Sequence, residues 1–280
     1  MKNLNGKVAA ITGAASGIGR ATALKLASYG CNLAISDMNE DGLKETAEMA
    51  EKFDVKVSIH MLDVSDRDAI YKFAADVKEN HKNVNIIINN AGVGLTAKVA
   101  DMSIEDFEWL MNINFWGVIN GTQAFLPYLE ESGEGHVVNI SSLFGLLSMP
   151  TQSAYNASKF AVRGFSESLR MELEMYGSNV SITSVHPGGI KTNIIANSKL
   201  LTKEGIFEDQ ARATKILEKQ FLTTADQAAE QIVNGILKNK RRVLIGRDAK
   251  FLDLLQRFFP AAYQKLIMAN AKKAFLSKKK

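Results

Sequence analysis

The feature that most restricts the fold of this chain is a glycine-rich turn near its N-terminus. Residues 13–19 read Gly-Ala-Ala-Ser-Gly-Ile-Gly and stand between a short apolar run at 7–12 and a helical pattern at 18–29. Gly13, Gly17 and Gly19 leave out side chains where the backbone must turn tightly and approach a bound group. A pyrophosphate held there would rest against the helix N-terminus and its partial positive charge. The order strand, glycine turn, helix therefore predicts a dinucleotide-binding βαβ unit.

The rest of the chain alternates between apolar, strand-like runs and helical patterns. Such alternation predicts an α/β fold, a Rossmann-like doubly wound parallel sheet with helices on both faces. We expect strands at 7–12, 32–36, 55–60, 84–88, 136–140, 180–185 and 242–246, and helices at 18–29, 40–52, 66–80, 103–130, 153–176 and 225–238. Since no Pro/Ser-rich linker or internal repeat divides these elements, we expect one dinucleotide-binding catalytic domain over residues 1–246. Residues 247–280 would form a basic amphipathic C-terminal extension.

Cysteine usage and hydropathy exclude several classes of protein. A single cysteine, Cys31, rules out an internal disulfide framework and suits a reducing compartment. No run of eighteen apolar residues is present, and the N-terminal residues run directly into the first strand without a signal-peptide pattern. We therefore expect a cytoplasmic protein. The four histidines are scattered and no Cys/His cluster has metal-ligand spacing, so we expect no metal site.

A tyrosine and a lysine four residues apart are the strongest candidates for acid–base chemistry. In a predicted helix, Tyr155 and Lys159 lie one above the other on the same face. A nearby ammonium favours the phenolate, so Lys159 would lower the pKa of Tyr155 from near ~10 toward neutrality. A Ser142 hydroxyl, thirteen residues before the tyrosine, could hydrogen-bond the same substrate oxygen. Taken alone, a Tyr-x-x-x-Lys pair also fits an ordinary amphipathic helix, and the glycine turn is what favours the catalytic interpretation.

Five motifs in a fixed order resemble those of the single-domain short-chain dehydrogenase/reductase family. They are Thr12-Gly13-x-x-x-Gly17-x-Gly19, Asn89-Asn-Ala-Gly92, Ser142, Tyr155-x-x-x-Lys159 and Pro187-Gly188. They occur at the family's spacings and cover residues 5 to about 192, with a family-like continuation to about 246. The resemblance implies hydride transfer between a nicotinamide cofactor and an alcohol or ketone.

The resemblance also implies a set of cofactor-binding residues. In the family, the glycine turn holds the pyrophosphate, the residues after the third strand contact the adenine, and the turn after the fourth strand borders the cofactor. A later loop fixes the carboxamide. The matching positions are Gly13, Ser16, Gly17, Ile18, Gly19, Asp37, Asp63, Val64, Asn90, Ala91, Gly92, Tyr155, Lys159, Pro187, Gly188 and Thr192.

Asp37, at the end of the second predicted strand, favours NAD over NADP. A carboxylate there accepts hydrogen bonds from the ribose hydroxyls and repels a 2′-phosphate. Met38 follows it, where a phosphate-binding form more often has arginine. Arg20 lies nearby in the sequence, so NADP stays open as the alternative.

Asn114 is implied by the resemblance as a fourth catalytic residue, which holds a water and links Lys159 to a proton path. A partly buried structural asparagine is the alternative. The thirteen-residue spacing to Tyr155 selects Ser142 rather than Ser141 as the catalytic serine. In the implied mechanism, Tyr155 exchanges a proton with the substrate oxygen and Ser142 orients that oxygen. Lys159 lowers the tyrosine pKa and binds the nicotinamide ribose.

The substrate is expected to be lipophilic. In the family, the region that corresponds to residues 193–224 covers the substrate, and apolar pockets favour apolar ligands with few polar anchors. The apolar residues are Ile194, Ile195, Leu200, Leu201, Ile206, Phe207 and Phe221 in that segment, and Leu143, Phe144, Leu147 and Met149 between the catalytic serine and tyrosine. The alternative is that they only pack a loop onto the core.

The C-terminal arm, residues 247–280, carries no family signature. Residues 238–280 hold 13 basic and 2 acidic side chains, whereas residues 1–237 hold 21 basic and 28 acidic ones. The arm begins with one wide apolar helix face, and Pro260 separates it from a second apolar-basic stretch at 261–276. The arm could pack over the substrate pocket or another subunit, or lie on an anionic membrane surface; solvation alone explains only the lysine tail. Nucleic acid is not favoured. The apolar helix face at the start of the arm consists of Phe251, Leu252, Leu254, Leu255, Phe258 and Phe259.

The leading hypothesis is an active NAD-dependent oxidoreductase acting on a secondary alcohol or ketone. The alternative is a non-catalytic NAD(P)-binding or scaffold protein that retains the fold. The presence of Ser142, Tyr155 and Lys159 favours the enzyme. The resemblance also implies a homodimer or homotetramer formed through the long helices that carry Asn114 and Tyr155.

Overall fold

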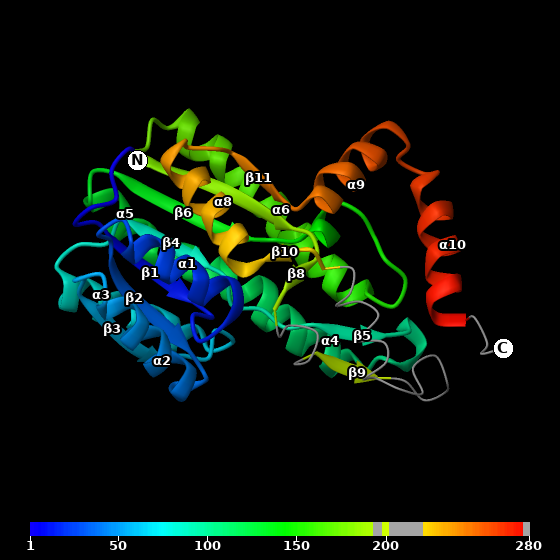
Figure 1. Ribbon diagram of the computed structural model, residues 1–280, viewed down its shortest axis with the longest axis horizontal. Coiled ribbons are helices and arrows are strands. Elements are labelled where there is room, and N and C mark those ends of the chain that lie inside the picture. The colour runs from blue at the N-terminus through cyan, green and yellow to red at the C-terminus, as the bar shows by residue number, and fades with distance from the viewer. Residues whose placement is uncertain (193–197, 202–220, 277–280) are drawn as a thin grey trace.

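The computed structural model of the chain describes residues 1–192, 198–201 and 221–276 (Figure 1). Its centre is a seven-stranded parallel sheet in the order β11-β7-β6-β4-β1-β2-β3. The order reverses direction next to β1, which confirms the doubly wound fold and creates the crevice in which such sheets bind ligands. The strands are β1 (Val8–Thr12), β2 (Asn32–Asp37), β3 (Val57–Met61), β4 (Ile86–Asn89), β6 (Gly135–Ile140), β7 (Val180–Pro187) and β11 (Arg242–Ile245).

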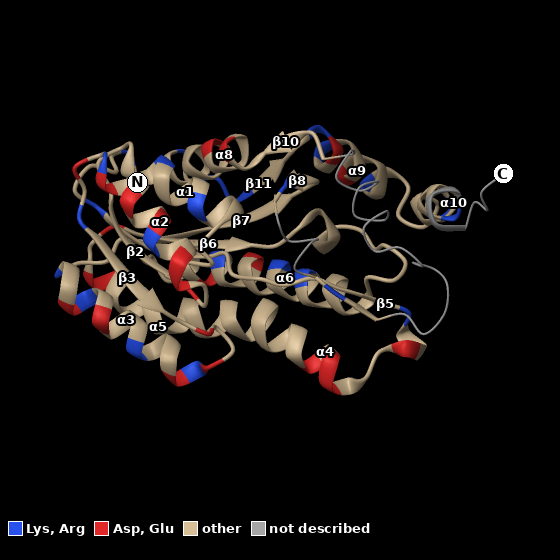
Figure 2. Ribbon diagram, turned by 60° about the horizontal axis from the view of Figure 1, so that its bottom comes forward, with Lys and Arg blue, Asp and Glu red and all other residues tan. Residues whose placement is uncertain are grey.

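Helices cover both faces of the sheet, with α1, α2 and α8 on one side and α3, α5 and α6 on the other (Figure 2). Alternation along β1 explains the two layers, because successive side chains point to opposite faces. Ile11 packs with Leu26 of α1, whereas Ala10 packs in the cluster that contains Phe125 of α5. The helices are α1 (Gly17–Ala27), α2 (Glu40–Glu51), α3 (Arg67–His81), α4 (Ile104–Met111), α5 (Gly117–Glu131), α6 (Ser153–Met175), α8 (Ala225–Leu237), α9 (Arg247–Phe258) and α10 (Tyr263–Leu276).

The helix predicted over 103–130 is interrupted in its middle. Helix α4 passes through a π-helical turn, η2 (Asn112–Trp116), before α5 begins. Two small parallel pairs were not predicted and lie outside the main sheet: β5 (Leu95–Ala97) with β9 (Lys199–Leu201), and β8 (Ile190–Lys191) with β10 (Thr223–Thr224). Single turns of 3-10 helix occur at η1 (Val99–Asp101) and η3 (Leu143–Gly145).

The C-terminal arm forms α9 and α10, which extend from one end of the molecule (Figure 1). Their inward side chains pack on the segment after β6, in a cluster that contains Leu143, Leu147, Ala249, Tyr263 and Ile267. The arm therefore contacts the segment after β6 through this shared apolar cluster. Within the described ranges, no helix is long and apolar enough to cross a membrane.

Candidate active site

The glycine turn after β1 has a backbone that only glycine accommodates easily. Gly13 and Gly17 have φ values of 68° and 55°, in the left-handed region. A Cβ added to Gly19 would lie 2.0 Å from the carbonyl oxygen of Gly13. The turn is thus as tight as the sequence predicted.

Polar groups after β4 hold this turn from the side. The amide nitrogen of the Asn90 side chain donates to the carbonyl oxygens of Thr12 and Gly13, at 2.9 and 3.0 Å. In return, the Thr12 hydroxyl accepts from the backbone N–H groups of Asn90 and Ala91, each at 3.0 Å. The two motifs, 78 residues apart at Thr12 and Asn90, are thus held together at the ends of the paired strands β1 and β4.

The Asp37 carboxylate lies beside the turn, at the end of β2. It accepts from the backbone N–H groups of Ala15 and Asn39, both at 3.1 Å. Arg20 is engaged elsewhere: it pairs with Glu45 at 2.7 Å and donates to the carbonyl oxygen of Ala15. Arg20, the residue that made NADP a possible cofactor in the sequence, is therefore already paired with a carboxylate.

The remaining predicted cofactor positions lie at or near the same edge of the sheet. Ser16 is exposed and makes no side-chain cap bond at the start of α1, and Ile18 is partly buried. Thr192 lies beside the turn, since its methyl carbon would be 3.3 Å from a Cβ at Gly17. After β3, Asp63 accepts from the N–H and hydroxyl of Ser65 at 2.8 and 2.7 Å. A cradle of glycines, a helix N-terminus and a carboxylate at the end of β2 fit a dinucleotide.

Ser142, Tyr155 and Lys159 are brought together where β6 ends against α6. Ser142 lies two residues after the end of β6, and its hydroxyl accepts from the backbone N–H of Phe144 at 3.1 Å. Its side chain lies near the Tyr155 phenol and acts to lower the pKa of that phenol. The ammonium of Lys159 lies 5.7 Å from the centre of the Tyr155 ring. The i and i+4 spacing on α6 thus yields the juxtaposition that the sequence predicted.

The electrostatics of the pair differ from the expectation drawn from the sequence. Burial raises the pKa of Tyr155, and the hydrogen bond from Ser142 opposes that rise. Burial also lowers the pKa of Lys159 to about 8. The lysine donates to the carbonyl oxygen of Ile140 at 3.1 Å rather than to the phenol. The pKa of Tyr155 is therefore raised rather than lowered as predicted, because burial of the phenol outweighs the effect of Ser142.

Asn114 is fully buried in the π-helical turn η2. Its side chain accepts from the backbone N–H of Val93 at 2.8 Å and donates to the carbonyl oxygen of Val93 at 2.9 Å. It also donates weakly to the Ser158 hydroxyl at 3.4 Å. A Cβ at Gly92 would lie 3.1 Å from the Asn114 oxygen and 3.5 Å from the Lys159 ammonium. Asn114 therefore fixes the turn after β4 directly beside the lysine.

Comparison with known proteins agrees with this geometry. The short chain dehydrogenase family pattern matches residues 7–201. The chain belongs to the short-chain dehydrogenase family. SadH of Mycobacterium tuberculosis, described as an oxidoreductase, is 44% identical over 276 residues, which cover 98% of this chain and 99% of that protein. Estradiol 17-beta-dehydrogenase 11 of Rattus norvegicus is 32% identical over 263 residues, covering 94% and 83%.

A solved structure shows the same relationship in three dimensions. A short-chain dehydrogenase/reductase from Burkholderia phymatum, crystallised in complex with NAD, superposes with a TM-score of 0.84 at 29% identity. The match covers 92% of this chain and 95% of that one. The shared fold thus extends well beyond the residues that carry the motifs.

In this short-chain dehydrogenase, the predicted carboxamide loop is anchored by a residue that sequence reasoning missed. Gly188 follows Pro187, the last residue of β7, and its backbone N–H donates to the carbonyl oxygen of Ile245 at 2.9 Å. The next N–H, that of Gly189, donates to the Asp248 carboxylate at 2.7 Å. A Cβ at Gly188 would lie 2.2 Å from that carboxylate. An acidic residue in the first turn of a helix was the available signal, but it normally indicates only a favourable helix end.

Asn156 is a second residue that the sequence reasoning missed. Its side chain donates to the carbonyl oxygens of Phe144 and Leu147, at 2.7 and 2.9 Å, and accepts from the N–H of Met149 at 3.1 Å. It therefore shapes the segment between the dehydrogenase's serine and tyrosine. An asparagine inside a helix has poor propensity, and this was the signal that could have revealed it.

The apolar residues proposed to line the substrate site are only partly within the described residues. Leu143 and Leu147 are buried, and Phe144 packs edge-on against Tyr155 with 6.2 Å between ring centres. Leu201 and Tyr155 both pack against the cluster of Leu95, Leu110 and Ala154. The Phe221 ring lies against Gly189. Ile194, Ile195, Ile206 and Phe207 lie outside the described residues.

Proposed function

We propose that this dehydrogenase interconverts a secondary alcohol and a ketone with NAD as the cofactor. The observation that carries the proposal is the juxtaposition of the Tyr155 phenol with the buried ammonium of Lys159, beside Ser142. When bound, NAD supplies the hydride acceptor or, as NADH, the donor. The protein's own groups then have to bind the substrate oxygen and move one proton.

Each of the three side chains has a distinct task in that proton transfer. Tyr155 takes the hydroxyl proton during alcohol oxidation and returns it during ketone reduction. Ser142 donates a hydrogen bond to the substrate oxygen and keeps the phenol oriented. Lys159 supplies a positive charge that favours the phenolate once proton transfer begins. The contact of Asn114 with the turn at Gly92 keeps the lysine side of the site in place.

Three observations support NAD rather than NADP. The Asp37 carboxylate stands at the end of β2, where it would accept hydrogen bonds from ribose hydroxyls and repel a 2′-phosphate. Arg20 is paired with Glu45. The Burkholderia phymatum relative was crystallised with NAD. The residues that would hold the cofactor are those of the glycine turn, Asp37, and the segments after β3, β4 and β7.

The substrate is proposed to be lipophilic. Leu143 and Leu147 are buried next to the serine, and Phe144 lies against the tyrosine, so the walls of this side offer few polar anchors. A relative named for estradiol, whose alcohol is secondary and whose skeleton is apolar, points to the same class.

We further propose a homodimer or homotetramer that associates through the long helices carrying Asn114 and Tyr155. Large apolar side chains are exposed along this side, at Ile104 on α4, Trp116 at the end of η2 and Phe160 on α6. Exposed apolar groups that gather on neighbouring helices are typical of subunit interfaces. The protein is proposed to act in the cytoplasm.

A panel of secondary alcohols and ketones of increasing chain length, run with NAD and with NADP, tests the proposal. We expect cofactor reduction with NAD, and higher kcat/KM for longer, apolar alcohols. Tyr155→Phe should lower turnover by at least about 100-fold while NAD binding, measured by fluorescence, persists. Near-normal turnover in that variant would contradict the assignment of Tyr155. Inactivity toward the whole panel, with cofactor binding intact, would favour a non-catalytic NAD(P)-binding protein.

A further inference from the structure

Helix α9 presents a narrow apolar stripe on its outer side. Phe251, Leu254 and Phe258 are 62%, 54% and 74% exposed, and their spacing of three and four residues places them on one face. The other half of the face predicted from the sequence turns inward, because Leu252 and Leu255 pack on the cluster of the arm. The arm of residues 247–280 thus covers the catalytic region with one side of α9 and leaves the other without an apolar partner among the described residues.

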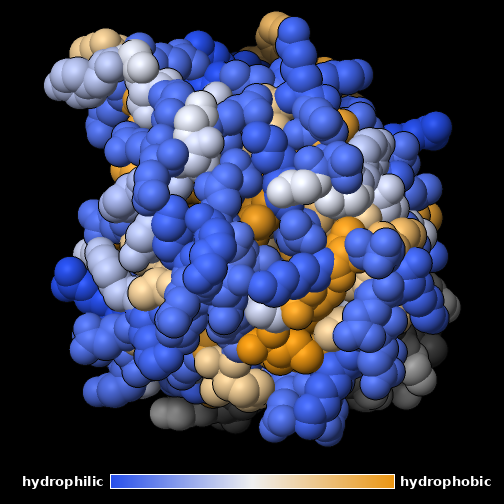
Figure 3. Space-filling model, turned by 90° about the vertical axis from the view of Figure 1, so that its left-hand side faces the viewer, coloured by the Kyte–Doolittle hydropathy of each residue, from blue (hydrophilic) through white to orange (hydrophobic). Residues whose placement is uncertain are grey.

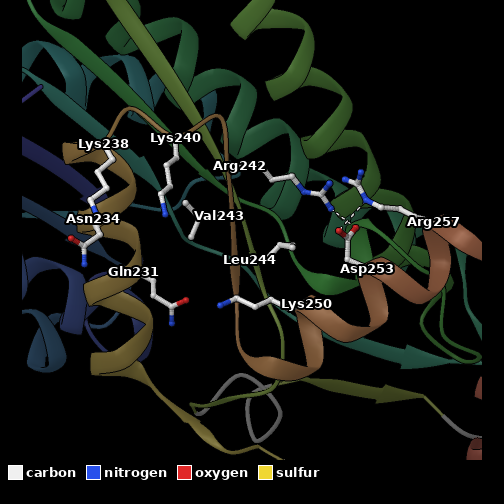
Figure 4. A pocket seen from close by; sticks show the side chains of 10 residues that line it. All are labelled: Gln231, Asn234, Lys238, Lys240, Arg242, Val243, Leu244, Lys250, Asp253 and Arg257. Atoms are coloured by element: carbon white, nitrogen blue, oxygen red, sulfur yellow. Dashed lines mark hydrogen bonds and ion pairs between the residues drawn. The ribbon is translucent and has the colours of Figure 1, made fainter.

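Basic side chains run beside this stripe and line a cleft. Lys250 and Arg257 each precede a stripe phenylalanine by one residue, so they lie about 100° around the helix from it. Both line a cleft of about 410 Å³ between α8, β11 and α9, together with Lys238 and Lys240 (Figure 4). Figure 4 shows Lys240 and Lys250 extending into the cleft from different elements.

The positive charge of the cleft is only partly compensated. Its one acidic lining residue, Asp253, is shared between Arg242 at 2.5 Å and Arg257 at 3.0 Å. No described acidic group pairs with the ammonium groups of Lys238, Lys240 or Lys250. The Nε of Arg242 is buried and has no hydrogen-bond partner among the described residues. The cleft is therefore built for an anion.

We propose that α9 docks this protein on an anionic lipid surface. The apolar stripe enters the interfacial layer, and the lysines of the cleft bind phosphate headgroups beside it. The other end of the molecule has a mainly hydrophilic surface with one hydrophobic strip (Figure 3), whereas α9 and α10 extend from the opposite end (Figure 1). Since the inner side of α9 packs near Leu143 and Leu147, docking places lipid close to the segment after Ser142.

A second copy of the chain fits this surface less well. A twofold contact would bring identical patches together. The stripe is preceded by Arg247, one turn before Phe251, and is flanked by Lys250 and Arg257. The acidic residues of α9 are not free to neutralise them, because Asp248 binds the Gly189 backbone and Asp253 binds two arginines. Like charges that face each other oppose association, whereas an anionic membrane neutralises them.

Vesicle flotation of the full chain tests the proposal. The probes are vesicles of neutral phosphatidylcholine and vesicles of phosphatidylcholine mixed with phosphatidylglycerol. We expect the protein to float with the anionic vesicles, to remain unbound when only neutral vesicles are present, and to be released by salt.

Combined Phe251→Ser, Leu254→Ser and Phe258→Ser substitutions should weaken vesicle binding at least about ten-fold. Combined Lys238→Gln, Lys240→Gln and Lys250→Gln substitutions should do the same through lost charge.

A matched control removes a similar exposed apolar surface from another helix end. Met171→Ser, Met175→Ser and Tyr176→Ser lie at the C-terminal end of α6, and flotation should be unchanged. Absence of wild-type flotation with anionic vesicles, or equal flotation of wild type and both α9 variants, would overturn the proposal. If the wild type does not bind vesicles and the stripe variant has a lower molar mass than the wild type by light scattering, the stripe is a contact between copies of the chain. The lysine variant keeps the test decisive should the stripe variant fold poorly.

Discussion

At the scale of single residues, the site places charge where the fold makes it costly. Lys159 is 3% exposed, and its ammonium donates a hydrogen bond to the carbonyl oxygen of Ile140. Burial lowers its pKa from 10.5 to about 8. Tyr155 stands in the same desolvated region with its pKa raised. A stability cost of this kind is expected at a site selected for proton transfer rather than for packing.

Replacing Lys159 with methionine should therefore stabilise the protein while it abolishes turnover. Because the folded pKa is depressed, the burial penalty is fully present below about pH 8 and fades as pH rises toward the unfolded value of 10.5. The shift corresponds to about 3 kcal/mol, and the lost hydrogen bond to Ile140 offsets part of it, leaving a net gain of about 1–2 kcal/mol at pH 7.

Urea denaturation at pH 7 and pH 10 measures this effect. The free energy of unfolding of the variant should exceed that of the wild type at pH 7, and the difference should shrink at pH 10. A variant that is less stable than the wild type at pH 7 would show that burial of the Lys159 charge does not destabilise the folded protein.

At the scale of elements, the loop after β7 is hydrogen-bonded to the start of α9. Asp248 accepts from the Gly189 backbone at 2.7 Å, and Gly246, with φ of 99°, leaves room for that carboxylate. The C-terminal arm is thereby tied to the loop proposed to fix the carboxamide. The position of that loop should depend on a residue outside the family's motifs.

Asp248→Ala should raise the KM for NAD by about ten-fold, because the loop loses a charge-assisted hydrogen bond. The effect on kcat should be smaller. Asp248→Asn is the matched control, since its amide oxygen can still accept from the Gly189 N–H and should keep KM within about three-fold of the wild-type value. Initial-rate kinetics with varied NAD distinguish the two variants, and equal KM values for alanine and wild type would contradict the anchoring role.

How far the sequence predicts these elements depends on the range of the interactions that form them. The main sheet and most of its helices follow from local periodicity and the glycine turn, and the structure confirms them. The π-helical turn at Asn114 does not, because it depends on hydrogen bonds to Val93, twenty-one residues away. The anchoring of Gly189 by Asp248 crosses fifty-nine residues. Such contacts leave no periodic pattern in the sequence.

At the scale of the whole molecule, the arm and the catalytic region share one apolar cluster. Tyr263 of α10 is 6% exposed, and its hydroxyl accepts from the backbone N–H of Ser148 at 3.2 Å. Leu143, Leu146 and Leu147 pack in the same cluster. The arm thus supports the segment between Ser142 and Tyr155 from outside, and the segment's shape should respond to changes in α10.

Tyr263→Ala should destabilise the protein by about 2–3 kcal/mol and raise the KM for the alcohol, while the KM for NAD stays near the wild-type value. The removed ring leaves a cavity in a cluster that borders the proposed substrate side and contains no residue of the glycine turn. Tyr176→Ala, at an 80% exposed position, is the control and should change neither stability nor KM. Thermal melts and initial rates measure both quantities, and a rise confined to the KM for NAD would contradict this role of the arm.

In the proposed reaction, a hydride passes directly between the carbinol carbon of a secondary alcohol and NAD, while Tyr155 moves the hydroxyl proton. The most direct measurement uses a lipophilic secondary alcohol with deuterium on its carbinol carbon and detects the label by mass spectrometry. We predict that deuterium appears in the reduced nicotinamide with the wild type and that Tyr155→Phe, while still binding NAD, forms almost none. Cofactor reduction without the label, or equal label transfer by the two proteins, would contradict the claim.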